Sequence, residues 1–289
     1  MNRRRFLMIS AAMAATPALA SRERWTGRAL GAEAQITLEA PPDVADKALA
    51  AARATLAEIE GLFTLHAPSA LTELNANGRL RMNPAFADLV QAADHAHHLT
   101  GGLFDPTVQP LWRALAEGRD PGPASALIGW ERVIHDNLAI TLDAGQALTF
   151  NGIAQGYATE AVRRTLTAHG LTRALIHVGE YAAISGPYRL GLSDPAHGLV
   201  ATRTLTGGAI ATSSPAATPL AGGGHILHQT ARPRWSTVSV EGPDATLADA
   251  LSTALCLADL DSVREIRARA GDAISRITLI DADGNIRTL

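Results

Sequence analysis

An aspartate and a threonine four residues apart, Asp249 and Thr253, form the pattern that points most directly to chemistry. On a helix, residues with this spacing lie on one face, one turn from each other. Two oxygen donors placed in this way can hold a hard cation such as Mg²⁺, which prefers oxygen ligands and usually also contacts phosphate. The structural alternative is an acid that is favourable in the first turn of a helix and a packed hydroxyl.

A glycine-containing turn is the second segment whose composition suggests a binding site. Residues 148–150 have the character of a strand, Asn151-Gly152 follows, and a helix is predicted from Ile153 to His169. Backbone N–H groups at such a helix start favour phosphate. The alternative is an ordinary connection from strand to helix. The glycine spacings of P-loop nucleotide-binding proteins and of dinucleotide-binding dehydrogenases are absent, which argues against both classes.

Histidines occur in two groups. His225 follows a glycine-rich loop, where an imidazole can act as a general base near neutral pH. His228 lies three residues further on, but no third ligand for zinc is evident nearby. The other group, residues 94–98, is predicted to be the polar surface of a helix. The only cysteine, Cys256, lies in an apolar run and is expected to be buried and inert.

The composition excludes several classes of protein. The chain has 289 residues, 28 acidic and 25 basic side chains, and a formal net charge of −3. A nucleic-acid-binding protein would have a strong basic excess. A single cysteine rules out an internal disulfide and a cysteine-rich metal site. Lys47 is the only lysine, so few positions could support lysine chemistry.

The first twenty residues are predicted to be a secretory signal peptide. Arg3 to Leu7 reads Arg-Arg-Arg-Phe-Leu, an apolar run extends from Met8 to Ala15, and Ala18-Leu19-Ala20 provides a cleavage pattern. The arginines followed by Phe-Leu resemble a twin-arginine signal, with an ordinary Sec signal as the alternative. Cleavage leaves residues 21–289 with 22 bases against 28 acids, a net charge of −6. No later stretch is a membrane span, so we expect a soluble periplasmic protein.

The elements that position these residues follow from periodicity and from capping signals. Asp43 can cap a helix over 44–63, Pro84 can begin one over 84–99, and Thr246 can cap one to about residue 257. Residues 117–126 and 213–224 are predicted loops. Strands and helices do not alternate strictly, which favours an α+β fold, and no linker divides the chain. The remaining helix is expected at 262–269, and strands are expected at 28–40, 139–142, 148–150, 174–178, 188–192, 209–212, 236–240, 277–280 and 286–289.

Taken in order, several segments resemble the ApbE family of FAD:protein FMN transferases, over about Leu30 to Leu260. The resemblance implies a T-fold-like α+β fold of mixed helices and antiparallel sheets in a single compact unit. The matching segments are Leu30-Gly31-Ala32, Phe63 to Asn75, Gly102 to Val108, Asn151 to Tyr157, Ala211-Thr212-Ser213, His225-Ile226-Leu227 and Ala248 to Ala254.

The resemblance also implies an activity. The family transfers the FMN half of FAD to a Thr or Ser hydroxyl of a partner flavoprotein and releases AMP. By positional match, Asp249, Thr253 and the carbonyl of Gly152 would hold Mg²⁺, and His225 would take the proton of the acceptor hydroxyl. For an exported member, the acceptor would be a membrane-associated flavoprotein with a periplasmic domain. The residues matched to the FAD site are Leu30, His66, Leu103, Phe104, Asp105, Thr149, Gln155 and Leu227.

Four positions depart from the family pattern. Gln155 replaces a lysine, Thr149 an aspartate, His66 a tyrosine and His228 an aspartate. Gln155 removes a cation near the phosphates but can still donate a hydrogen bond. Two other functions therefore stay open: an FAD pyrophosphatase in which water replaces the acceptor, and a catalytically silent flavin carrier or assembly factor.

Overall fold

The central element of the fold is an antiparallel sheet, in agreement with the predicted α+β class. The computed structural model describes residues 22–221 and 223–289, so the predicted signal peptide lies outside the described residues. The sheet has eight strands in the order β1-β2-β6-β7-β10-β13-β14-β15. The strands are β1 (Arg22–Ala29), β2 (Ala32–Glu39), β6 (Ala174–Val178), β7 (Glu180–Ala183), β10 (Gly208–Ser213), β13 (Thr237–Gly242), β14 (Arg276–Ile280) and β15 (Ile286–Thr288).

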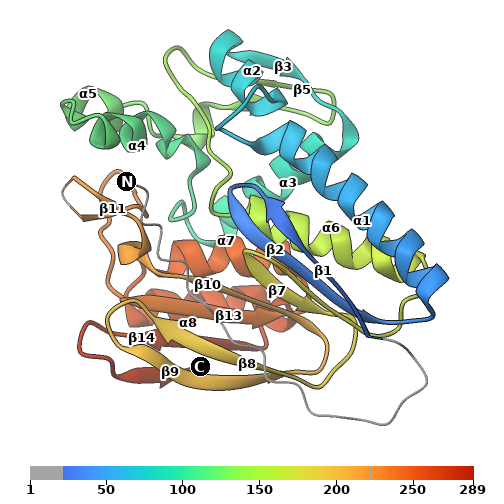
Figure 1. Ribbon diagram of the computed structural model, residues 1–289. Helices are drawn as coiled ribbons and strands as arrows, with labels where there is room; N and C mark the ends of the chain where they lie inside the picture. Colours follow the sequence, from blue (N-terminus) through green and yellow to red (C-terminus); the bar gives the residue numbers. More distant parts are fainter. Residues whose placement is uncertain (1–21, 222) are drawn as a thin grey trace.

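Helices cover one face of this sheet (Figure 1). Apolar side chains of α1 and α6 pack on β2 and β6, and those of α7 and α8 pack on β13 and β14. No helix in the described part of the chain is both long and apolar enough to span a membrane. The helices are α1 (Pro42–Phe63), α2 (Ala70–Asn77), α3 (Pro84–Leu99), α4 (Gln109–Ala116), α5 (Pro121–Ser125), α6 (Ala154–Ala168), α7 (Ala245–Leu255) and α8 (Leu260–Ala270).

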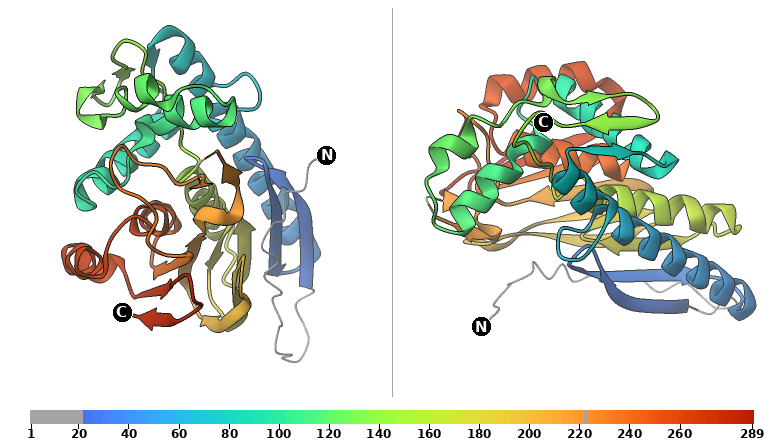
Figure 2. Two further views of the ribbon diagram at one scale, coloured as in Figure 1. Left: turned by 90° about the vertical axis from the view of Figure 1, so that its left-hand side faces the viewer. Right: turned by 90° about the horizontal axis from the view of Figure 1, so that it is seen from above.

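Smaller sheets complete the fold. The hairpin of β8 (Tyr188–Asp194) and β9 (Gly198–Leu205) packs on the opposite face, where Tyr188 and Leu190 meet Tyr181 and Ile210. A three-stranded sheet and α2 lie together on the side of the helices that faces away from the eight-stranded sheet (Figures 1 and 2). The strand order of this small sheet is β3 (Arg79–Arg81), β5 (Ala139–Thr141) and β4 (Ile134–His135). β11 (Pro219–Leu220) and β12 (Gly223–Gly224) form a short hairpin.

Several local predictions differ from the structure. The predicted loops at 117–126 and 213–224 contain α5 and the β11–β12 hairpin. Helix α1 begins at Pro42, so Asp43 lies in its first turn instead of capping it. Asp244, and not Thr246, caps α7, because its side chain accepts a hydrogen bond from the N–H of Leu247 at 3.1 Å. An aspartate at the N-cap satisfies an N–H group that has no partner within the helix.

The strand predicted over 28–40 is two strands joined by a tight turn at Leu30 and Gly31. These residues have φ values of 49° and 75°. A two-residue hairpin turn with positive φ at both positions fits the twist of antiparallel strands. Leucine rarely adopts this conformation, because its side chain is crowded there. The turn therefore escaped prediction, and it brings Leu30 to the end of the sheet.

Helices α6 and α7 approach closely at Gly156, and this contact positions Asp249 of α7 against the start of α6. A Cβ atom at Gly156 would overlap the backbone carbonyl of Ala245 and the Cβ of Asp249. Only glycine allows the two helices to lie so close. The glycine therefore sets the spacing between the start of α6 and the first turns of α7.

We predict that Gly156→Ala destabilises the protein by about 1–3 kcal/mol, the usual cost of overpacking a tight contact. Gly61→Ala in α1 is the matched control, since nothing lies within 4 Å of its added methyl group. It should leave stability unchanged or raise it by up to about 1 kcal/mol, because alanine favours helix. Urea unfolding measures both changes. Equal stabilities of the two variants would contradict the close contact.

Candidate functional site

One large cavity brings together all of the residues predicted to form the site. Its volume is about 1670 Å³. It is lined by the β1–β2 turn, the segment after α1, the loop before α4, the starts of α6 and β7, the end of β10, the segment after β12, and α7. The predicted residues on its wall are Leu30, His66, Leu103, Phe104, Asp105, Thr149, Gly152, Gln155, His225, Leu227, Asp249 and Thr253.

Asp249 lies at the seam between α6 and α7. The residue is only 3% exposed, and its Oδ2 accepts a hydrogen bond from the N–H of Gly156 at 2.8 Å. Burial raises the pKa of Asp249 to about 7, and the Gly156 hydrogen bond opposes that rise. Within the described residues, no hydrogen bond or ion pair reaches the other oxygen, Oδ1. This oxygen is available to a ligand in the cavity.

Thr253 lies one turn along α7, next to the carbonyl of Gly152. Its Oγ1 is 3.4 Å from that carbonyl oxygen and 3.2 Å from Oγ of Ser213. Together with Asp249, this gives a carboxylate, a hydroxyl and a carbonyl, all oxygen donors, on one wall of the cavity. Such a donor set suits a hard divalent cation better than zinc, which favours histidine and cysteine.

Glu180 is a second buried carboxylate on the same wall, at a position that no sequence motif predicts. Its Oε2 accepts a hydrogen bond from the N–H of Thr212 at 2.8 Å. Burial and the charge of Asp249 raise the pKa of Glu180 well above its ordinary value. The only available signal in the sequence was an acid in the apolar run from Ala174 to Ala183.

His225 is half-buried and held by a backbone carbonyl. Its Nδ1 lies 3.0 Å from the carbonyl oxygen of Pro215. Because a carbonyl only accepts hydrogen bonds, Nδ1 must carry the proton, which leaves the lone pair on Nε2. Burial lowers the pKa of His225, while hydrogen bonds with Pro215 and Thr218 oppose this effect. Burial therefore favours the neutral imidazole, which is able to accept a proton.

A chain of buried hydroxyl groups fixes the backbone next to Pro215. Thr237 donates a hydrogen bond to Oδ2 of Asp194 at 2.6 Å, and its oxygen is 2.7 Å from Oγ of Ser214. Since the Thr237 proton is already committed, Ser214 must be the donor to Thr237. Burial acts to raise the pKa of Asp194, but hydrogen bonds from four neighbours lower it below the ordinary value. The ionised Asp194 thus anchors the segment that orients His225.

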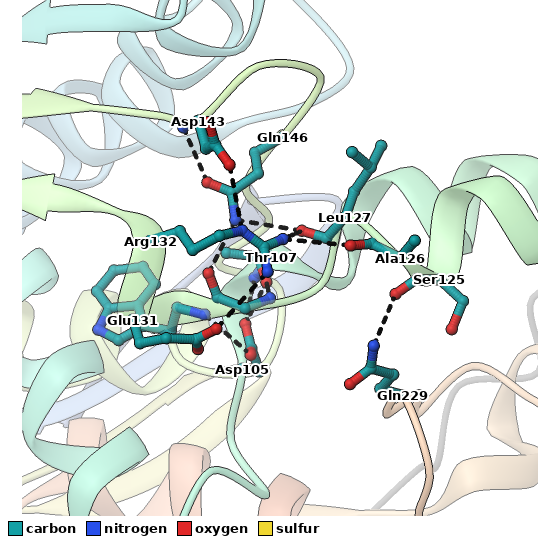
Figure 3. A network of polar contacts seen from close by, with 12 residues as sticks. Asp105, Thr107, Ser125, Ala126, Leu127, Glu131, Arg132, Asp143, Gln146 and Gln229 are labelled. Carbon is teal, nitrogen blue, oxygen red and sulfur yellow. Dashed lines mark hydrogen bonds and ion pairs between the residues drawn. The ribbon is translucent and has the colours of Figure 1, made fainter.

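Asp105 uses its carboxylate to shape the loop before α4 (Figure 3). Oδ1 accepts hydrogen bonds from the N–H and the hydroxyl of Thr107, at 2.8 and 2.5 Å. Oδ2 accepts one from the N–H of Trp130 at 3.3 Å. The Thr107 oxygen in turn accepts one from Gly129 at 2.8 Å. Asp105 therefore holds the wall formed by Leu103 and Phe104 in place.

The four positions that are expected to depart from the family pattern have distinct environments. The side chain of Gln155 packs over Gly179, where a Cβ atom would overlap its amide. Thr149 accepts a hydrogen bond from the N–H of Asn151 at 3.2 Å. His66 is exposed on the cavity wall. Nδ1 of His228 accepts hydrogen bonds from the N–H groups of the two residues that follow Gln229, at 3.2 and 3.0 Å, so it organises its own loop.

The histidines of residues 94–98 and Cys256 lie outside this site. His95 and His98 are exposed on α3, as predicted, but His97 is half-buried with Nδ1 at 2.9 Å from the carbonyl of Phe104. No group of three or more His, Cys, Asp or Glu side chains in the described residues could hold a metal ion. Cys256 is fully buried, and burial raises the pKa of its thiol. It is therefore unreactive, in line with the prediction.

Comparisons with known proteins agree with this architecture. The model of the ApbE family matches residues 30–275. A FAD:protein FMN transferase of Rhodobacter capsulatus is 30% identical over 258 residues, which cover 76% of this chain and 48% of the relative. The chain thus spans about half the length of that curated relative.

Solved structures show the same fold. The crystal structure of the ApbE protein of Thermotoga maritima has a TM-score of 0.79 at 23% identity, covering 92% of this chain and 96% of that one. The apo flavinyl transferase ApbE of Pseudomonas stutzeri has a TM-score of 0.77 at 22% identity, covering 93% and 94%.

The raised pKa of Asp249 predicts how stability depends on pH. Between the ordinary value of 3.8 and about 7, the folded protein keeps a proton that the unfolded chain has lost. The free energy of unfolding therefore falls as the pH rises through this window. Asp249→Asn cannot titrate and should show a smaller fall. Urea unfolding of chelator-treated protein at pH 5, 6, 7 and 8 measures this, and parallel profiles would contradict the assigned burial.

Proposed function

Because the chain belongs to the ApbE family, we propose that it is a FAD:protein FMN transferase that uses Mg²⁺. It takes FAD as substrate and transfers FMN to a Thr or Ser hydroxyl of an acceptor flavoprotein. The observation that carries the proposal is the meeting of Asp249, Thr253 and the Gly152 carbonyl on one cavity wall. Their oxygen donors come from segments about one hundred residues apart, with Thr253 Oγ1 3.4 Å from the Gly152 oxygen.

Different residues of the site serve the proton transfer, the binding of the cation and the binding of the flavin. Nε2 of His225 accepts the proton of the acceptor hydroxyl, whose oxygen attacks the FMN phosphorus. The bond between that phosphorus and the bridging oxygen breaks, and AMP leaves with the bridging oxygen. When bound by Asp249, Thr253 and Gly152, Mg²⁺ would neutralise charge on the pyrophosphate. Leu103 and Phe104, supported by Asp105, provide an apolar wall for the flavin.

The transfer assay tests this proposal. Purified protein with FAD, Mg²⁺ and a flavoprotein acceptor domain should release AMP and leave covalent flavin fluorescence on the acceptor in a denaturing gel. His225→Gln should lower kcat by about 10²–10⁴-fold, the usual contribution of a general base. Asp249→Ala should abolish turnover. His95→Gln, on the exposed face of α3, is the matched control and should retain full activity.

Three outcomes would redirect the assignment. AMP release without an acceptor, with no flavin on any acceptor, would instead identify an FAD pyrophosphatase. FAD binding that is independent of Mg²⁺, with no turnover, would identify a flavin carrier. Full transfer activity of His225→Gln would remove this histidine from the mechanism while leaving the transferase assignment in place.

We further propose that the protein works in the periplasm, where a membrane-associated flavoprotein with a periplasmic domain is its acceptor. The support is the sequence of residues 1–20, with arginines before Phe6-Leu7 and a cleavage pattern at 18–20. We predict that the mature protein begins at residue 21 and is recovered in the periplasmic fraction. Replacing Arg3 to Arg5 with lysines should block export if the twin-arginine route is used. N-terminal sequencing and cell fractionation measure both, and unaffected export would favour the Sec route.

A further inference from the structure

Glu180 enters the cavity from a strand that has no motif of its own. It follows Gly179, which has a φ of 79°, and begins β7. The residue is only 7% exposed, yet it lines the same cavity as Asp249. Its Oε2 accepts the hydrogen bond from Thr212. In the part of the chain that the structure describes, no hydrogen bond or ion pair reaches Oε1.

Another buried glutamate, Glu160, differs from Glu180 because arginines compensate its charge. Glu160 on α6 is 3% exposed, but Arg163 lies 2.7 Å and Arg164 3.4 Å from its Oε1. No arginine, lysine or histidine makes an ion pair with Glu180 or Asp249 among residues 22–221 and 223–289. Two buried carboxylates on one wall with no cation beside them are costly to ionise, because their charges repel and each has lost part of its hydration. Protonation can relieve this cost, and so can a bound divalent cation, which would let both groups ionise.

We propose that Glu180 is a further ligand of the divalent cation assigned to Asp249, Thr253 and Gly152, either directly or through one bound water. This inference rests on the proposed function, since it concerns the same cation. Asp249 and Glu180 each line the cavity with one carboxylate oxygen that has no hydrogen-bond or ion-pair partner among the described residues. A magnesium ion usually needs one or two carboxylates together with substrate phosphates. With two carboxylates, this wall binds the cation before FAD arrives.

Binding of Mn²⁺ to FAD-free protein tests the proposal independently of activity. The free Mn²⁺ signal in electron paramagnetic resonance gives the affinity. We expect the wild type to bind one ion, Asp249→Asn to lose binding, and Glu180→Gln to bind at least about tenfold more weakly, consistent with the 10–100-fold cost of losing a metal-site partner. Glu33→Gln is the matched control, because Glu33 is an exposed glutamate on the same cavity. It should bind as the wild type does.

Each other outcome overturns the proposal in a distinct way. Wild-type affinity in Glu180→Gln removes Glu180 from the site and leaves the proposed transferase standing. Equal weakening in Glu33→Gln shows a long-range effect of charge instead of ligation. Absence of Mn²⁺ binding in FAD-free wild type rules out a cation site that precedes the substrate. Unchanged binding in Asp249→Asn contradicts the cation site itself, and circular dichroism checks that each variant is folded.

Discussion

The structure depends on a carboxylate buried between two helices. Asp249 is placed at the seam of α6 and α7 because Gly156 has no side chain, and the N–H of the same glycine donates to Asp249 at 2.8 Å. Helix spacing, the turn that presents the Gly152 carbonyl, and the position of Thr253 all follow from this contact. A longer side chain at 156 would move the helices and the donors together. The site and the packing are therefore one constraint and not two.

Basic side chains are distributed so that none forms an ion pair with Asp249 within the described residues. The only lysine, Lys47, is exposed on α1, and Glu160 takes Arg163 and Arg164 as partners. Arg22, Arg24 and Arg113 also line the cavity, but their side chains are exposed. Within the described residues, the arginines that line the cavity are exposed, while Asp249 and Glu180 on its wall are buried and have no ion-pair partner. These exposed arginines would attract an anionic substrate to the cavity, and the proposed cation would bind at its acidic wall.

Elements whose capping and periodicity signals lie in their own sequence were predicted correctly. Helix α3 runs from Pro84 to Leu99 as expected, because Asn83 caps it and Pro84 begins it. Residues 148–150 look like a strand but are not one. The side chain of Asn75 replaces a neighbouring strand, since its amide nitrogen donates to the carbonyl of Leu148 at 2.9 Å and its Oδ1 accepts from the N–H of Leu148 at 2.7 Å. A pairing with a side chain seventy-three residues away has no local signature.

The site residues that were predicted have a local sequence signal, whereas Glu180 joins the site only through contacts between distant segments. Helical spacing alone places Asp249 and Thr253 on one face, but only the fold brings the Gly179 turn against them. Gln155 shows what depends on this arrangement, because its amide packs over Gly179, next to Glu180. A lysine at this position would place an ammonium group near Glu180 and offset part of the charge of the carboxylates. The neutral amide leaves that charge in place. A neutral amide at 155 and an acid at 180 therefore act in the same direction, and both would increase the attraction of this wall for the proposed divalent cation.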